Sequence, residues 1–370
     1  MTDIRRVEGR REFKRFIDYA YQRNAADPHW VPPLRLAEHE RLTAAKNPFF
    51  QHADVELLLA FRSDRIVGRI AAIDDRLHNQ THGDNVAMFG FFEAEDGEAA
   101  HAVLDAAERW ARARGRAAIR GPISPSLNES AGLLVDGFDS DPVLMMPHNP
   151  QEYAAQIEGA GYRKVKDLFA WIYELQQDTP AAIARLAKRL GDKHGITVRQ
   201  LNLKEFTNEV ERLRRIYSAA WERNWGFVPP TPAEFRRLAT ELKPIFDPRA
   251  AVVAEAGGEV IACLVSVPDI NQALKGTNGR LLPLGLPRLL LRNRYITQVR
   301  LLLLGVDARF RPFGLYPLLV YAWHQQLRGT QYARAEFSWV LEDNRDINQP
   351  AEMAGARRYK TYRIYEKTLA

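Results

Sequence analysis

The chain of 370 residues is 46% hydrophobic and 10% aromatic, which predicts about two folded domains and argues against wholesale disorder. A formal net charge of +6 favours anionic partners, such as a phosphate-bearing cofactor, nucleic acid or an acidic lipid surface. The single cysteine, Cys263, excludes a disulfide framework and a cysteine-based metal site, and the charged N-terminus, which has no apolar signal region, predicts a cytoplasmic protein.

The first half of the chain alternates strand and helix patterns. Residues 12–27 have the pattern of a helix, and residues 55–73 indicate a hairpin that turns at Ser63 and Asp64. A strand, an amphipathic helix and a second strand are then expected at 85–92, 98–114 and 116–121. After a long loop at 122–147, a short helix ends in glycine and an aromatic strand follows.

The second half repeats this order after two helices expected at 179–194 and 204–223. A proline-rich loop at 224–235 and a hairpin at 250–267 follow. A strand, a helix and a strand are then expected at 298–306, 313–328 and 333–341, before a closing helix and strand.

This repetition predicts an α/β (α+β) fold built from two tandem lobes. Each lobe is expected to be a mixed, mostly antiparallel sheet flanked by helices. We place the first lobe at residues 1–178 and the second at residues 179–370.

Residues 300–316, RLLLLGVDARFRPFGLY, carry the strongest functional signal. A strand ends at Val306, and a basic turn with Arg311 and Gly314 leads into a helix. The N-terminus of a helix presents backbone N–H groups at its positive dipole end, which suits a pyrophosphate. Arg311 adds a charge-assisted bond, and Gly314 removes a side chain that would block close approach. The pattern predicts a site for a phosphorylated acyl carrier.

The hairpin, the V-x-x-x-x-R-x-x-G motif that begins at Val306, and the later Asn344 and Gly355 together resemble the GNAT superfamily of acyl-CoA N-acyltransferases. The resemblance implies acyl-CoA as co-substrate, with acetyl or longer chains, and no metal. It assigns cofactor binding to Val306, Arg309, Arg311, Phe313, Gly314, Leu315, Tyr316 and Asn344. Three positions depart from the family pattern: Ala308 replaces a proline, Tyr316 a small residue, and Ala351 the tyrosine that often protonates the leaving thiolate.

The chain is also similar to two-lobed bacterial GNAT-like proteins, through GPISPSLNESAGLLVDGF, NWGFVPPTPAEF, VPDINQALKGTNGRLLP and SWVLEDN. Some relatives of this type are linked to N-acylation of long-chain amines in bacterial ceramide formation. In the first lobe, Glu93, Glu95 and Asp96 stand where the cofactor loop belongs and would repel a pyrophosphate. We therefore expect the first lobe to be a structural or substrate-binding partner.

Acyl transfer to an amine needs a base, and Glu342 and Asp343 follow the last strand of the motif. The alternative is that one of them caps the next turn and faces water. Tyr362 is our candidate to protonate the departing thiolate, although at least two of Tyr359, Tyr362 and Tyr365 are expected in the core.

Four residues are candidates for substrate binding: Asp269, Asn271, Lys275 and Trp225. A turn role for Asp269 and Asn271, a solvated surface role for Lys275 and a core role for Trp225 are the alternatives. Residues 281–304 are rich in leucine and arginine and are interrupted by two prolines. Such a segment either lies on an anionic membrane or lines an acyl-chain pocket. The alternative is a buried strand preceded by a short core helix.

The sequence thus favours an acyl-CoA-dependent N-acyltransferase that acts on a small or lipid-like amine bound between the lobes. One alternative is a Fem-like transferase that uses aminoacyl-tRNA, and another is an inactive acyl-CoA-binding protein. Nucleic acid is not expected as a partner, because no basic run with interleaved stacking aromatics occurs. Peripheral contact with the inner face of an anionic membrane is also consistent with the leucine- and arginine-rich segment. The sequence does not indicate the acyl length, the identity of the amine or the oligomeric state.

Overall fold

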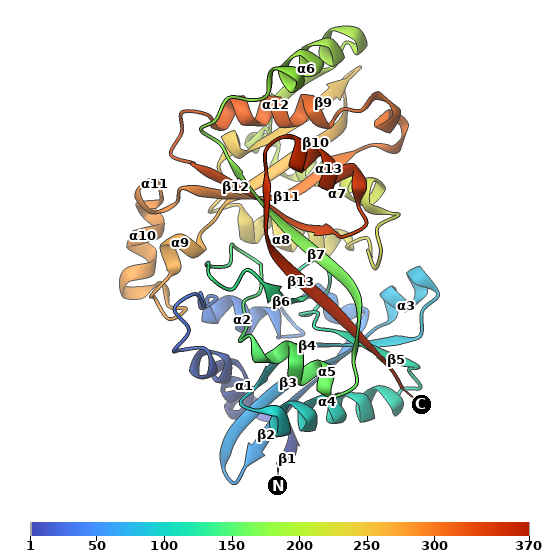
Figure 1. Ribbon diagram of the computed structural model, residues 1–370, viewed down its shortest axis with the longest axis vertical. Helices are drawn as coiled ribbons and strands as arrows, with labels where there is room; N and C mark the ends of the chain where they lie inside the picture. Colours follow the sequence, from blue (N-terminus) through green and yellow to red (C-terminus); the bar gives the residue numbers. More distant parts are fainter. Residues whose placement is uncertain (1, 370) are drawn as a thin grey trace. The chain divides into compact units, whose positions relative to one another are not determined.

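The computed structural model describes residues 2–369, apart from the side chains of Lys193 and His194. The chain forms two compact units (Figure 1). Unit 1 contains the residues up to Phe169, Leu274–Gly285 and the residues from Lys360 onward. Unit 2 contains Ala170–Ala273 and Leu286–Tyr359.

Unit 1 contains a mixed sheet with strand order β1-β2-β3-β4-β5-β13. The strands are β1 (Asp3–Arg6), β2 (Ala53–Arg62), β3 (Arg65–Asp75), β4 (Val86–Ala94), β5 (Ala118–Gly121) and β13 (Arg357–Thr368). All neighbours are antiparallel except β4 and β5, which are parallel. The short β6 (Leu133–Asp136) pairs with β13. Two strands are shared between the units: β7 (Arg163–Glu174) begins in unit 1 and ends in unit 2, and β13 begins in unit 2 and belongs to unit 1 from Lys360 onward.

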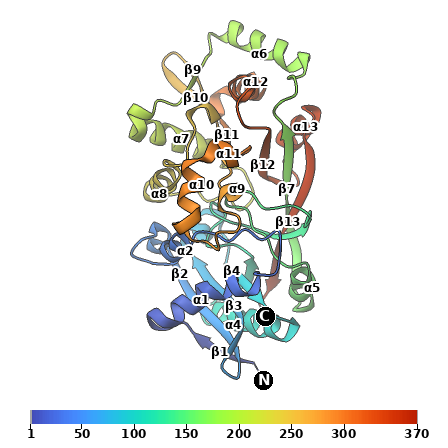
Figure 2. The same ribbon diagram turned by 90° about the vertical axis from the view of Figure 1, so that its left-hand side faces the viewer.

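Helices cover both faces of this sheet (Figures 1 and 2). The helices and helical turns of unit 1 are α1 (Gly9–Arg23), α2 (Arg35–Arg41), η1 (Pro48–Gln51), α3 (Arg76–His82), α4 (Gly97–Arg112), α5 (Glu152–Gly159) and η4 (Leu281–Gly285). A Cβ on Gly68 would lie 3.2 Å from Val103 of α4, whereas the next residue, Arg69, donates to the carbonyl of Phe16 in α1. Because successive side chains of a strand point to opposite faces, α1 and α4 pack on opposite sides of β3.

Unit 2 repeats the arrangement with strand order β12-β11-β10-β9-β8. The strands are β8 (Thr197–Gln200), β9 (Ala251–Ala256), β10 (Glu259–Pro268), β11 (Gln298–Val306) and β12 (Arg334–Leu341). The strands from β8 to β11 are antiparallel, and β11 and β12 are parallel. Both halves of the chain therefore place one parallel pair at the equivalent position in the order of elements.

The helices of unit 2 also lie on two faces. They are α6 (Ala181–His194), η2 (Leu203–Glu205), α7 (Phe206–Trp221), α8 (Pro232–Leu242), η3 (Pro248–Ala250), α9 (Asn271–Leu274), α10 (Leu286–Leu290), α11 (Arg292–Tyr295), η5 (Ala308–Phe313), α12 (Tyr316–Leu327) and α13 (Arg345–Met353). Val265 of β10 belongs to the core cluster of α7, whereas the next residue, Ser266, accepts a 2.9 Å hydrogen bond from Trp323 of α12. The alternation of side chains thus places α7 and α12 on opposite faces.

Both predicted hairpins are confirmed. Strands β2 and β3 are joined through Ser63 and Asp64, and β9 and β10 through Gly257 and Gly258. Cys263 of β10 is buried, and burial raises the pKa of its thiol to about 12, so the thiol is protonated at neutral pH.

The segment before β11 corrects one sequence interpretation. A short core helix was one expectation there, but α10 and α11 leave Leu286, Leu290 and Leu291 exposed. Pro287 lies near the start of α10, and each helix is about one turn long, so neither has a continuous apolar face to bury. Within residues 2–369, no helix combines the length and hydrophobicity that crossing a bilayer requires.

Candidate functional site

The parallel strands β11 and β12 separate part of the way along their length. Their register runs from Gln298 opposite Arg334 to Leu301 opposite Phe337. Beyond this point β11 continues to Val306 and stays paired with β10 on its other side. The pairing with β12 therefore does not extend to residues 302–305, whose backbone groups that point away from β10 form an edge of this strand. Such an edge can bind an extended ligand by backbone hydrogen bonds.

A buried arginine lies where the two strands separate. Arg300 donates to the hydroxyl and the carbonyl of Ser338 at 3.1 and 3.2 Å, and both residues are buried. Trp339, the next residue of β12, lies near Trp221 of α7, with 5.8 Å between ring centroids. Sequence analysis did not include these residues in the site. An arginine within the apolar strand QVRLLLL was the available signal, because a buried guanidinium needs polar partners.

The turn that follows β11 is at the surface. Val306 is buried, but Arg309, Phe313 and Gly314 are exposed. Gly314 has a φ of 64°, and a Cβ there would meet no atom within 4 Å. The left-handed backbone, rather than crowding, therefore requires glycine, and open space lies beside the turn.

Helix α12 begins directly after this turn. Leu315 is its N-cap and is buried, and Tyr316 is its first residue. Pro317 has no N–H group, so Leu315, Tyr316 and Leu318 supply the backbone donors of the first turn. Burial raises the pKa of the Tyr316 hydroxyl, which therefore stays protonated and able to donate. This end of α12 can bind an anion.

The two arginines of the turn differ in their surroundings. Arg309 donates to Asp307 at 3.0 Å and to Glu259 at 2.7 Å, and these hydrogen bonds raise the pKa of its guanidinium. Its charge is thus balanced by two carboxylates. Arg311 instead donates to the carbonyl of Ala219, near the C-terminal end of α7. Because a carbonyl carries no net charge, Arg311 is the better candidate to attract a phosphate.

In unit 1 the equivalent strand gap is filled by the chain itself. After β5, Ile123 donates its N–H to the carbonyl of Phe89 at 2.7 Å, and the Ser124 hydroxyl accepts from the N–H of Phe91 at 2.8 Å. A Cβ on Gly90 would lie 1.9 Å from the Ile123 carbonyl oxygen. The edge of β4 is therefore covered where that of β11 is open.

The N-terminus of α4, the helix that follows β4, is capped by a carboxylate from the chain itself. Asp96 caps α4 by accepting from the Ala99 N–H, and the hydrogen bond from Arg62 lowers the pKa of this carboxyl. Glu93 is half-buried and accepts from the Tyr153 hydroxyl, and desolvation raises the pKa of its carboxyl although Arg69 lies nearby. The Asp96 carboxylate already occupies the end of α4 that would otherwise attract a phosphate.

The candidate bases Glu342 and Asp343 follow the last residue of β12, on the strand that separates from β11. Glu342 is half-buried and Asp343 is exposed. Asn344 is the N-cap of α13, without a side-chain capping bond. The structure thus brings these three residues to the same unit as the Arg309–Tyr316 turn. Tyr362 is fully buried on β13 in unit 1, opposite Leu134.

Earlier on β12, Glu336 is fully buried, and its carboxylate accepts from the Tyr359 hydroxyl. The expectation that at least two of the three terminal tyrosines are core residues is confirmed, because Tyr362 and Tyr365 are fully buried. Only the half-buried Tyr359 of this group belongs to unit 2.

The four proposed substrate-binding residues are not gathered at one place. Asp269 is buried and accepts from the backbone N–H of Asn271 at 3.2 Å, as in an Asx turn. Trp225 is half-buried in the loop after α7. Lys275 belongs to unit 1, where it donates to both oxygens of Asp141 at 2.7 Å.

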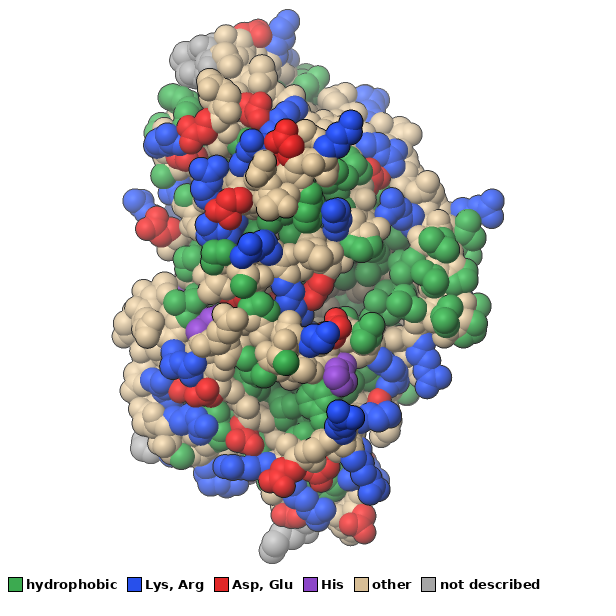
Figure 3. Space-filling view, turned by 180° about the vertical axis from the view of Figure 1, so that it is seen from behind, with side chains coloured by type: hydrophobic (Ala, Val, Ile, Leu, Met, Phe, Trp, Pro, Cys, Tyr) green, Lys and Arg blue, Asp and Glu red, His purple; other side chains and the backbone are tan. Residues whose placement is uncertain are grey.

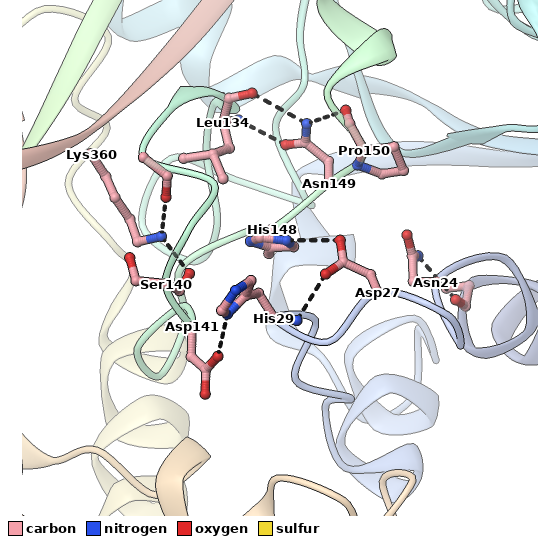
Figure 4. Close-up of polar contacts among 12 residues, drawn as sticks. Asn24, Asp27, His29, Leu134, Ser140, Asp141, His148, Asn149, Pro150 and Lys360 are labelled. Carbon is pink, nitrogen blue, oxygen red and sulfur yellow. Dashed lines mark hydrogen bonds and ion pairs between the residues drawn. The ribbon is translucent and has the colours of Figure 1, made fainter.

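Histidine–carboxylate pairs surround that ion pair in unit 1 (Figure 4). His29 lies 2.9 Å from Asp141, and His148 lies 3.0 Å from Asp27. Burial lowers the pKa of His148 despite the neighbouring Asp27. The partners in each pair are more than a hundred residues apart in the sequence, so no local motif indicates them.

The same region contains a buried lysine. Lys360 donates to the carbonyls of Gly137 and Ser140 at 2.6 and 2.7 Å (Figure 4). These contacts satisfy backbone carbonyls of the irregular loop between β6 and α5. The part of the chain that the structure describes contains no group of three or more His, Cys, Asp or Glu residues arranged for a metal ion.

Two bacterial relatives match almost the whole chain. It is 41% identical over 366 residues to a bacterial ceramide synthase of Caulobacter vibrioides, covering 97% of this chain and 95% of the relative. It is 35% identical over 375 residues to the protein YghO of Escherichia coli K12, covering 99% and 95%. No protein-family model matches the chain.

Solved structures share the fold at low sequence identity. A tandem GNAT protein from the clavulanic acid biosynthesis pathway matches with a TM-score of 0.58 and 13% identity, covering 100% of this chain and 99% of that one. A GCN5-related N-acetyltransferase from Sphaerobacter thermophilus matches with a TM-score of 0.52 and 13% identity, covering 100% and 96%. The predicted fold of two tandem GNAT-like lobes is confirmed.

Proposed function

Because the chain belongs to the two-lobed GNAT family that includes the Caulobacter vibrioides ceramide synthase, we propose that it is an acyl-CoA-dependent N-acyltransferase acting on a lipid-like amine. The choice of acyl-CoA as the acyl donor rests on one observation. In unit 2 an open strand edge and the free N-terminus of α12 follow one another along the chain, whereas in unit 1 the equivalent edge is covered.

The open edge suits the pantetheine arm of coenzyme A. The arm is an extended chain with two amide groups, so it can pair with the backbone of residues 302–305 as an added strand would. In our proposal the diphosphate lies at the turn before α12, which contains Arg311 and leads to the backbone N–H groups of Leu315 and Tyr316. A phosphate there would be stabilised both by the helix dipole and by the Arg311 guanidinium, which donates to a neutral carbonyl.

The acceptor amine must lose a proton before or during attack on the thioester. In our proposal Glu342 takes that proton, directly or through water, because it is half-buried at the end of β12. Asp343 is the weaker candidate, since its exposed carboxylate is well solvated. The thioester carbon then gains a bond to nitrogen, and coenzyme A leaves as a thiolate that must be protonated.

The proposed acceptor class rests on the named relative. A ceramide synthase joins an acyl chain to a long-chain amine, and the relative of that name matches this chain over almost its full length. We extend the acceptor class to this chain and leave the acyl length to experiment.

The direct test mixes the purified protein with a series of acyl-CoAs and long-chain amines, and follows the free thiol and the amide product. The proposal predicts thiol release that depends on the amine, together with an equimolar amide. Binding of CoA without release for any amine would favour an acyl-CoA-binding protein, and activity only with aminoacyl-tRNA would favour a Fem-like transferase. Either result would overturn the proposal.

A further inference from the structure

Large apolar side chains are concentrated on α10 and α11 of unit 2. Leu290 is 77% exposed. Three more large apolar side chains within ten residues are exposed: Leu286, Leu291 and Tyr295. Figure 3 shows hydrophobic side chains gathered over α10 at its right-hand side. Such a group of exposed apolar residues marks an interaction surface, whereas single exposed leucines need no explanation.

The same segment, Leu286–Tyr295, is basic. It contains Arg288, Arg292 and Arg294 and no acidic residue. The nearest carboxylates along the chain are Asp269 and Asp307. The Leu286–Tyr295 segment therefore adds positive charge to its apolar surface.

This combination selects one class of partner. We propose that the Leu286–Tyr295 segment docks the protein on an anionic lipid bilayer. The leucines enter the boundary between head groups and acyl chains, and the arginines lie at the lipid phosphates. A second copy of the chain is a poorer partner, because a self-complementary contact would bring arginines against arginines.

The local structure fits shallow insertion rather than spanning. Helices α10 and α11 have 5 and 4 residues, and Pro287 lies near the start of α10. Leu282 and Leu284, which precede them in the sequence, are exposed as well. Strand β11 begins at Gln298, three residues after Tyr295. Docking would hold the start of the proposed donor strand near the membrane in which a lipid-like amine resides.

The test is sedimentation of the full chain with vesicles of phosphatidylcholine alone or mixed with phosphatidylglycerol. We expect binding to the anionic vesicles only, weakened by salt. Leu290→Glu combined with Leu291→Glu should reduce the bound fraction at least about tenfold, and so should Arg292→Glu combined with Arg294→Glu. Met353→Glu is the matched control, because Met353 is 81% exposed on α13, and it should bind as the wild type does.

Equal binding to neutral vesicles, or full binding by the two double variants, would overturn the proposal. So would a wild-type dimer that Leu290→Glu with Leu291→Glu separates, because the segment would then be a protein interface. Melting temperatures of the variants exclude misfolding. The docking does not rest on the transfer chemistry: a variant that loses vesicle binding but still acylates a detergent-dispersed amine separates the two proposals.

Discussion

At the scale of single residues, the two arginines of the turn before α12 give a matched comparison. Arg311 donates to a neutral carbonyl, whereas Arg309 is balanced by Asp307 and Glu259. We expect Arg311→Gln to weaken CoA binding about tenfold and Arg309→Gln to change it little, because only the first removes a guanidinium whose hydrogen bond goes to a neutral carbonyl. Isothermal titration with CoA measures both. Equal losses in the two variants would remove Arg311 from the site.

Glu342 and Asp343 allow a similar comparison for the base. Glu342→Gln should lower kcat about a hundredfold or more and abolish the fall in rate toward acid pH, because the amide accepts no proton. Asp343→Asn should leave both features unchanged, since Asp343 is exposed. Steady-state rates across pH test this. A Glu342→Gln enzyme with the wild-type rate would require another base.

The buried His78 should make the stability of the protein depend on pH. Burial lowers the pKa of its imidazole to about 4, and His82 and Arg120 act in the same direction. In the unfolded chain a histidine has a pKa of about 6.5, so between these values the unfolded state binds more protons. Stability should therefore fall as pH drops from about 6.5 toward 4, by up to about 3 kcal/mol for this group.

The measurement is thermal unfolding at several pH values for the wild type and His78→Gln. The variant should show a shallower fall in melting temperature on the acid side, whatever its stability at neutral pH. Parallel curves for both proteins would show that His78 contributes no pH dependence.

At the scale of elements, Gly305 sets how closely α7 packs on β11. A Cβ there would lie 2.9 Å from Ala220 and 3.2 Å from Ile216. Gly305→Ala should destabilise the protein by about 1–3 kcal/mol through overpacking. Gly159→Ala in α5 is the control, because no atom lies within 4 Å of its added Cβ, and it should be neutral or slightly stabilising. Urea unfolding measures both, and equal effects would contradict the packing argument.

The sequence predicted these elements well where local signals were strong. Gly257 and Gly258 marked a turn between alternating strands, and Gly314 marked the end of the turn before α12. Local patterns do not encode strand pairing. Nothing in RLLLLGV indicates that β12 leaves β11 after Leu301, and nothing near Ile123 indicates that it covers β4. The difference between the strand edges of the two halves could therefore be seen only in the structure.

Side-chain partners distant in sequence were also beyond prediction. Lys275 was expected either at a solvated surface or at the substrate, and it forms an ion pair with Asp141, 134 residues away. Glu336 is buried with its carboxylate beside the Tyr359 hydroxyl, and this contact depends on the tertiary packing of β13. Such pairs follow from the fold, so motif and periodicity alone do not identify them.

At the scale of the whole molecule, the two halves share an order of elements but differ at the strand edge. Unit 2 keeps an open edge on β11 and a helix N-terminus without an acidic cap, whereas unit 1 covers the edge of β4 and caps α4 with Asp96. This difference explains how a tandem repeat can contain one acyl-donor site rather than two. The chain is thus expected to bind one CoA.

Hydrogen exchange with and without CoA tests this central claim most directly. The account predicts slower exchange at residues 302–318, which contain the open edge and the start of α12, with no change at residues 86–94 of unit 1. Unchanged exchange at 302–318 under saturating CoA, or protection confined to β4, would contradict it.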